Sequence, residues 1–151
     1  EQPVMGRDVE GMAKIALHSS CLISADEGLH SLEDIRRHHR ELAAHGGSLK
    51  TIKLGGITRA LQATELFHDL GMNVNLAGKT AETSIASAAI LHIAAAAKNL
   101  FWGVSPTAPY LAVDVVYNPI VVKSGHVQAP VEPGLGVMVN EDALLSYARP
   151  S

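Results

Sequence analysis

Short runs of β-branched and other apolar residues alternate along the chain with longer stretches in which apolar side chains recur every three or four positions. The short runs predict strands and the longer stretches predict amphipathic helices. The predicted strands are residues 21–25, 48–52, 73–77 and 100–104. They recur roughly every 25 residues with a predicted helix in each interval, and another helix, residues 8–18, precedes the first strand.

Capping residues mark the ends of the predicted helices. Ser31 can cap the helix of the first interval, with Asp34 three positions on, and His45, Gly46 and Gly47 are predicted to stop it. Gly71 is predicted to end the second helix, since glycine adopts the left-handed C-terminal conformation without strain. The third helix is rich in alanine, which allows close packing on a sheet.

A strand followed by a helix, repeated at this spacing, predicts parallel strands joined by right-handed crossovers, and therefore an α/β fold. Eight such units close a (β/α)8 barrel, so the four units seen here predict half of one. The pattern breaks at Pro106. We expect residues 1–105 to form half of a barrel domain, and residues 106–151 to pack on its flank with a hairpin around Ser124 and Gly125 and a helix capped by Asn140.

Composition narrows the classes of function. The net charge of -3 argues against nucleic acid as a partner. A single cysteine, Cys21, favours a reducing compartment, and we expect a cytoplasmic protein. The longest apolar stretch, Ile85 to Ala97, is too short to cross a bilayer, so no membrane partner is expected. Because the chain begins at Glu1 rather than at a methionine, we interpret it as part of a longer protein.

Charged residues gather where the predicted strands end. Glu1, the pair Asp26 and Glu27, the lysines Lys50 and Lys53, and then Lys79 and Glu82 hold these positions. Because the loops after barrel strands converge at one mouth, we expect the side chains to meet. Carboxylates on neighbouring strands with an amine opposite suit a divalent cation. Taken alone, Asp26 and Glu27 are more typical of a polar loop that caps the following helix. Lys79 and Glu82 are equally typical of a helix start with a surface lysine.

Two lysines compete for the position of the acid or base. Side chains alternate along a strand, so only one of Lys50 and Lys53 can point into the barrel if residues 48–52 form a strand. Periodicity leaves the choice open. For Lys53 we favour a surface position at the strand end.

A Glu-Gln-Pro at the start, an Ala-Asp-Glu after the first predicted strand and a lysine five residues before a Gly-Gly pair follow one another in this chain. With the turn from Gly78 to Glu82 and the Pro-Gly-Leu-Gly-Val of residues 133–137, they resemble the enolase superfamily and, within it, the muconate lactonizing enzyme subgroup. The resemblance covers essentially the whole chain and implies the C-terminal half of the barrel, strands five to eight.

The resemblance implies a Mg²⁺-dependent enzyme that removes the proton α to a carboxylate and passes through an enediolate. It places Glu1 and Asp26 as metal ligands, with a third ligand before this sequence begins, and it selects Lys50 as the catalytic lysine from the Gly-Gly spacing. Glu82 is implied as a further catalytic residue. Glu27 would orient a neighbouring group, and Lys79, a departure from the family pattern, would pair with a substrate carboxylate.

The expected reaction is a cycloisomerisation, a racemisation or epimerisation, or a dehydration of a small carboxylate or amino-acid derivative. A faint similarity around Trp102 to Ser105, with Thr107 and Tyr110 after it, points to hydroxyproline or proline-betaine substrates. We expect a homo-oligomer, and no turnover by this chain alone. Two alternatives stay open: an aldolase-like barrel enzyme in which a lysine forms a Schiff base, and a half-barrel without catalysis that associates to cover its open edges.

Overall fold

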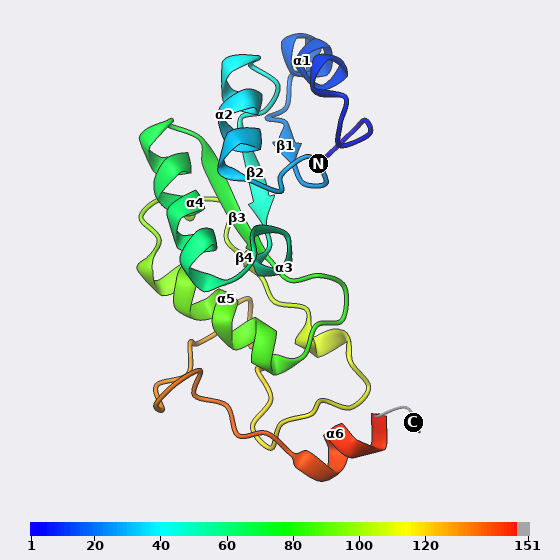
Figure 1. Ribbon diagram of the computed structural model, residues 1–151, viewed down its shortest axis with the longest axis vertical. Helices are drawn as coiled ribbons and strands as arrows, with labels where there is room; N and C mark the ends of the chain where they lie inside the picture. The colour runs from blue at the N-terminus through cyan, green and yellow to red at the C-terminus, as the bar shows by residue number, and fades with distance from the viewer. Residues whose placement is uncertain (148–151) are drawn as a thin grey trace.

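The computed structural model describes residues 1–147 and shows an α/β architecture built on one parallel sheet (Figure 1). The strands lie in the order β1-β2-β3-β4, and every neighbouring pair is parallel. Their bounds are Ser24–Ala25 for β1, Gly46–Leu49 for β2, Asn73–Ala77 for β3 and Val104–Ser105 for β4. The predicted α/β class is confirmed, and the strand order is that of successive strands in a barrel.

Helices α2, α4 and α5 follow one another along one side of the sheet, with α1 beside the first strand (Figure 1). The helices are α1 (Val9–His18), α2 (Leu32–Arg40), α3 (Thr51–Leu54), α4 (Ile57–Asp69), α5 (Ser84–Ala96), the 3-10 turn η1 (Ala108–Tyr110) and α6 (Glu141–Tyr147). Among residues 1–147, no helix is both long and apolar enough to cross a membrane.

The caps that the sequence predicts are present. The side chain of Asp8 accepts from the amide of Gly11 at 2.8 Å, and Ser31 accepts from the amide of Asp34 at 3.1 Å. Gly71, two residues after the end of α4, adopts a φ of 66°, as predicted for a helix end. These local interactions fix where α1, α2 and α4 begin or end.

Gly46 and Gly47 do not stop a helix, and that prediction is wrong. Helix α2 ends at Arg40, and both glycines lie in β2. A Cβ on Gly46 would stand 2.2 Å from the carbonyl oxygen of Asn73, and one on Gly47 would stand 2.4 Å from Leu29. Glycine is therefore required by close packing in the sheet and not by a turn.

The second predicted strand is wrong in its second half. Strand β2 ends at Leu49, and Thr51–Leu54 form the short helix α3, which Gly55 ends with a φ of 85°. The strand period therefore does not apply to Lys53.

The core lies between the sheet and its helices. Phe67, Ile35, Met12 and Leu49 are fully buried there. Removing apolar surface of this size from water is the main stabilising contribution to such a layer. The same packing holds the ends of β1, β2 and β3 side by side.

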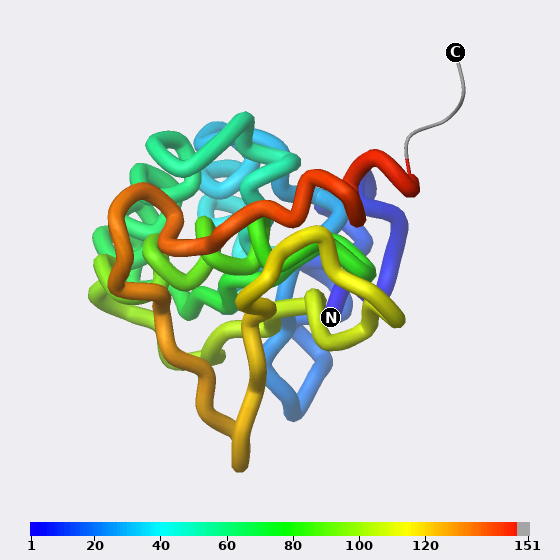
Figure 2. Tube along the Cα trace, turned by 90° about the horizontal axis from the view of Figure 1, so that it is seen from below, coloured from blue at the N-terminus to red at the C-terminus, as the bar shows by residue number. Residues whose placement is uncertain are grey.

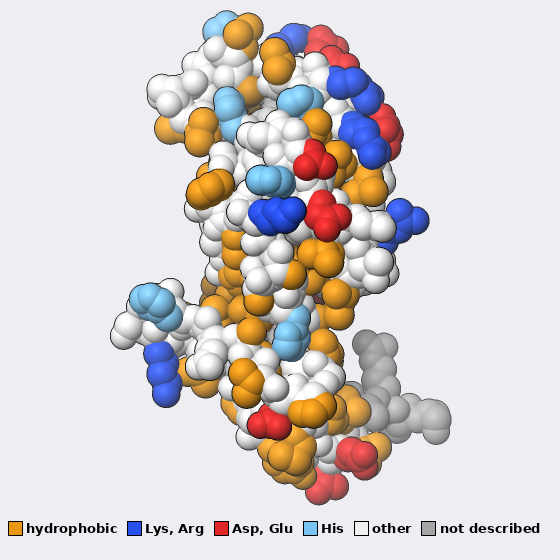
Figure 3. Space-filling view, turned by 90° about the vertical axis from the view of Figure 1, so that its left-hand side faces the viewer, with side chains coloured by type: hydrophobic (Ala, Val, Ile, Leu, Met, Phe, Trp, Pro, Cys, Tyr) orange, Lys and Arg blue, Asp and Glu red, His pale blue; other side chains and the backbone are white. Residues whose placement is uncertain are grey.

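The C-terminal segment runs across the underside of α5 when the molecule is seen from below (Figure 2). Ile120 is buried against Leu91 of α5, and Asn140 caps α6 by accepting from the amide of Ala143 at 3.1 Å. The predicted hairpin is reduced to one bridge between Lys123 and His126. Hydrophobic side chains lie on the surface of this lower part (Figure 3). Residues 148–151, which belong to the predicted C-terminal segment, lie outside the described residues.

Candidate active site

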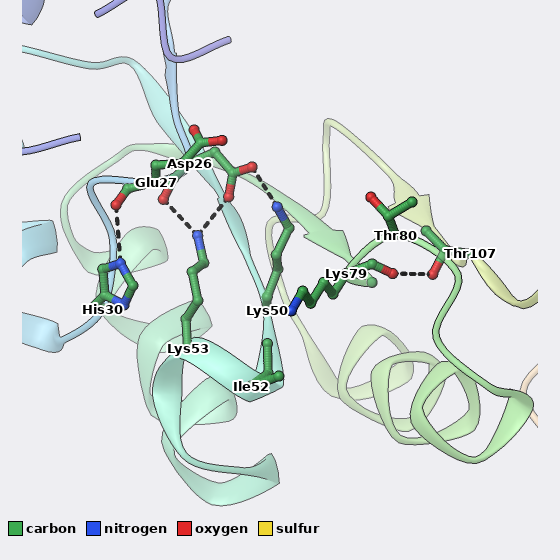
Figure 4. A pocket seen from close by; sticks show the side chains of 10 residues that line it. Asp26, Glu27, His30, Lys50, Ile52, Lys53, Lys79, Thr80 and Thr107 are labelled. Atoms are coloured by element: carbon green, nitrogen blue, oxygen red, sulfur yellow. Dashed lines mark hydrogen bonds and ion pairs between the residues drawn. The ribbon is translucent and has the colours of Figure 1, made fainter. Parts of the chain in front are cut away.

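A cavity of about 550 Å³ opens at the carboxyl ends of the strands (Figure 4). Its walls come from the segments that follow β1, β2, β3 and β4. Of the residues selected from the sequence, it is lined by Asp26, Glu27, Lys50 and Lys79. The structure therefore brings these four side chains to one place, as expected for loops that follow neighbouring parallel strands.

Hydrogen bonds fix both the backbone and the side chain of Asp26. The side-chain oxygen of Gln2 accepts from the amides of Asp26 at 2.8 Å and Gly28 at 3.1 Å, which fixes the turn after β1. The carboxylate is 9% exposed, and its two oxygens bind the ammonium groups of Lys50 and Lys53. Sequence reasoning missed Gln2, whose only signal was its place beside Glu1.

The predicted surface position of Lys53 is wrong, because its side chain is only 11% exposed. Helix α3 turns the chain back after β2, so the ammonium of Lys53 reaches the carboxylate and the carbonyl oxygen of Asp26, both at 2.6 Å. It also donates to the carbonyl of Ser48 at 3.2 Å. The signal in the sequence was Gly55-Gly56, which allows a helix to end within one turn of the strand.

Charge and burial compete at this ion pair. Burial raises the pKa of the Asp26 carboxyl, but hydrogen bonds from Lys50 and Lys53 outweigh burial and hold that pKa below its usual 3.8. Burial lowers the pKa of Lys53 below 10.5 and outweighs its bond to Asp26. The site therefore keeps an ionised carboxylate and disfavours the ammonium form of a buried amine.

The low pKa of Asp26 predicts a loss of stability in acid. A carboxyl with a depressed pKa in the folded state contributes stability that is complete above about pH 5 and is lost as the pH falls through the folded pKa. We expect the free energy of unfolding, measured with urea at pH 6 and at pH 3, to fall further in the natural chain than in Asp26→Asn. Equal losses in the two proteins would contradict this assignment.

Glu1 does not line the cavity, but its side chain contacts β2 close to Lys50. The Ser48 hydroxyl donates to its carboxylate. Ser48, which binds Glu1, and Lys50, which binds Asp26, are two positions apart at the end of β2. Two residues of an extended chain span about 7 Å, so the two carboxylates bind residues that lie close together. Within residues 1–147 no three His, Cys, Asp or Glu side chains gather as a metal-binding group. Two carboxylates in this arrangement fit Mg²⁺ as part of a ligand set, since this ion is usually held by one or two carboxylates.

Lys79 and Glu82 share the turn between β3 and α5. The side chain of Lys79 extends toward Lys50 (Figure 4). Glu82 does not line the cavity. Its Oε2 is buried and has no hydrogen-bond partner within residues 1–147. A Cβ on Gly78 would lie 3.1 Å from that oxygen. The structure thus separates the two: Lys79 faces the cavity, and Glu82 packs behind Gly78.

Glu27 lines the cavity but forms no ion pair among the residues that the structure describes. Its carbonyl oxygen is 3.1 Å from the ring of His30. His30 and Thr107 also line the cavity. Sequence reasoning assigned no role to His30, and Thr107 entered only through the faint similarity after the fourth predicted strand.

Comparison with known proteins matches residues 1–143 to the family described as enolase C-terminal domain-like. The chain belongs to this family. The resemblance found in the sequence is thereby confirmed, and the half-barrel is the C-terminal half of a (β/α)8 barrel.

Similar proteins include a chloromuconate cycloisomerase of Cupriavidus pinatubonensis, which is 34% identical over 100% of this chain and 41% of its own length. An N-succinyl-L-Arg/Lys racemase of Bacillus cereus is 31% identical over 95% of this chain and 38% of its own length. The crystal structure of 2-chloromuconate cycloisomerase from Rhodococcus opacus superposes with a TM-score of 0.92 at 25% identity, covering 99% of this chain and 40% of that one. The chain thus spans about two-fifths of the length of these relatives.

Proposed function

We propose that this chain is the C-terminal part of a Mg²⁺-dependent enzyme that isomerises a small carboxylate by removing the proton α to the carboxylate. The observation that carries the proposal is the meeting of the Lys50 amine and the Asp26 carboxylate inside one cavity at the carboxyl ends of neighbouring strands. One proposed metal ligand and the proposed base therefore lie together there.

Glu1 and Asp26 would hold the ion together with ligands from the rest of a longer protein. When bound, Mg²⁺ supplies positive charge that stabilises a substrate carboxylate as it becomes more electron-rich. Lys50 would take the α proton with its side-chain nitrogen, and the electron pair left on the α carbon would be delocalised into the carboxylate. Lys79 pairs with a carboxylate of the substrate, Glu82 supports the turn that carries Lys79, and Glu27 orients the loop after β1.

The names of similar proteins support isomerisation over a Schiff-base reaction. They include cycloisomerases, a racemase and a hydrophobic dipeptide epimerase, besides an o-succinylbenzoate synthase. The substrate we propose is therefore a small carboxylate or an amino-acid derivative. We also propose a cytoplasmic location, which the single cysteine supports. We further propose that the protein associates with other copies of itself, which exposed apolar residues such as Val131, 84% exposed, support.

Proton exchange tests the proposal. The test uses a chimera in which residues 1–151 of this chain replace the aligned part of the Cupriavidus pinatubonensis chloromuconate cycloisomerase. The rest of the chimera, including the preceding strands, comes from that relative. In D₂O with Mg²⁺, we expect NMR to show deuterium entering the α position of muconolactone or of N-succinyl-L-arginine. We expect the 151-residue chain by itself to exchange neither. A folded chimera that exchanges no carboxylate in the presence of Mg²⁺ would contradict the proposed function.

A further inference from the structure

The hydroxyl of Thr107 joins the loop after β4 to the turn that carries Lys79 and Glu82. It donates to the carbonyl oxygen of Lys79 at 2.6 Å and accepts from the amide of Glu82 at 3.1 Å. Thr107 is 8% exposed and lines the cavity. Figure 4 shows its bond to Lys79, whose side chain extends from there toward Lys50. One hydroxyl therefore uses both its donor and its acceptor on a single turn.

The turn that Thr107 holds is strained. Ala81 has a φ of 57°, in the left-handed region, which is unfavourable for a residue with a Cβ. Such a conformation persists only where the surrounding structure fixes it. The two groups that Thr107 binds, the carbonyl of Lys79 and the amide of Glu82, lie on either side of Ala81. The hydroxyl thus fixes the strained residue from both sides, in addition to the turn's own bond from the Glu82 amide to the Lys79 carbonyl at 3.2 Å.

The turn is packed tightly around Gly78. A Cβ on Gly78 would meet the Thr107 hydroxyl oxygen at 2.6 Å and the Glu82 carboxylate at 3.1 Å. The amide of Gly78 donates to the carbonyl of Ser105 at 3.0 Å, which ties the start of the turn to β4. The turn is therefore packed against the residues that follow β4, and Thr107 provides its polar contact there.

We propose that Thr107 is a positioning residue, whose hydroxyl holds the turn so that Lys79 faces the cavity and binds a carboxylate of the substrate. The proposal rests on the proposed function only for the nature of the ligand. The hydroxyl itself need not touch the substrate, because it acts through the backbone of residues 79–82.

Asp114 supplies a matched control, because it anchors the same region at another point. Its carboxylate accepts from the amide of Ser84 at 3.0 Å and caps α5. Asp114→Asn weakens this cap and leaves the Thr107 hydroxyl in place. A loss of stability alone would therefore affect Asp114→Asn and Thr107→Val alike, whereas a loss of positioning would affect only Thr107→Val.

Binding of cis,cis-muconate to the 151-residue chain, followed by NMR titration, tests the proposal. We expect Thr107→Val, which keeps the side-chain shape, to raise the dissociation constant about tenfold, the effect of one hydrogen bond. Thr107→Ser and Asp114→Asn should stay within about twofold of the natural chain, because both keep the hydroxyl. With Lys79→Met already present, Thr107→Val should cause no further loss, since the two residues act through one contact.

Unchanged affinity in Thr107→Val, no rescue by serine, or additive losses with Lys79→Met would overturn the proposal. If the natural chain binds no muconate, the carboxylate-binding role of the proposed function fails. Hydrogen exchange of the Glu82 amide then decides the role of Thr107 separately. Faster exchange in Thr107→Val than in Thr107→Ser supports positioning by the hydroxyl, and equal exchange rates contradict it.

Discussion

Replacing Lys50 with methionine is expected to lower the rate of α-proton exchange in the chimera by about 10²- to 10⁴-fold, the range for loss of a positioned general base. Lys50 follows β2 directly, and its ammonium lies on the Asp26 carboxylate inside the cavity. Methionine keeps an unbranched apolar chain and removes only the amine. The measurement is deuterium uptake by NMR at saturating Mg²⁺, which separates loss of the base from loss of the ion.

Lys14 provides the control for this substitution. Its side chain is 71% exposed and, among residues 1–147, forms an ion pair only with Glu10 on the surface of α1. Lys14→Met should leave the exchange rate unchanged. If Lys50→Met exchanges protons as fast as Lys14→Met, the base lies elsewhere, and Lys53 becomes the next residue to replace.

Replacing Asp26 with alanine is expected to lower the free energy of unfolding of the 151-residue chain by about 3–5 kcal/mol, the usual effect of breaking a buried ion pair from one side. The change leaves two ammonium groups, of side chains 20% and 11% exposed, facing each other without a carboxylate. Urea unfolding followed by circular dichroism measures the effect.

Two further variants separate charge from packing. Glu27 is exposed, so Glu27→Ala should change stability by no more than about 0.5 kcal/mol. Combining Asp26→Leu with Lys53→Met removes both the carboxylate and the more buried cation, and should recover part of the stability lost in Asp26→Ala. A loss below about 1 kcal/mol in Asp26→Ala would show that the ion pair is no stronger than one on the surface.

The parts of the fold that local chemistry determines could be predicted from the sequence. Asp8, Ser31 and Gly71 cap helices through contacts within a few residues, and the alternation of apolar patterns alone indicates a parallel sheet. Gly46 and Gly47 were misinterpreted because their reason lies across the sheet, in the carbonyl of Asn73 and the side chain of Leu29. Sequence spacing carries no information about such approaches.

The site divides in the same way. Because loops after neighbouring parallel strands converge, the sequence predicted that Asp26, Lys50 and Lys79 would meet, and all three line one cavity. The same reasoning could not place Lys53, whose buried position depends on a one-turn helix that interrupts the strand period. The positions of Gln2 and Thr107 along the chain also could not reveal their roles, since both side chains bind backbone amides or carbonyls of distant segments. Residues of this kind become visible only when the chain is folded.

The most direct test of the central claim is where a divalent cation binds. Mn²⁺ added to the ¹⁵N-labelled 151-residue chain broadens the amide signals of residues close to it. The proposed binding of the ion by Glu1 and Asp26 predicts selective broadening around Asp26 and Ser48, abolished by Asp26→Asn and competed away by Mg²⁺. Broadening confined to other parts of the chain, or unchanged by Asp26→Asn, would contradict it.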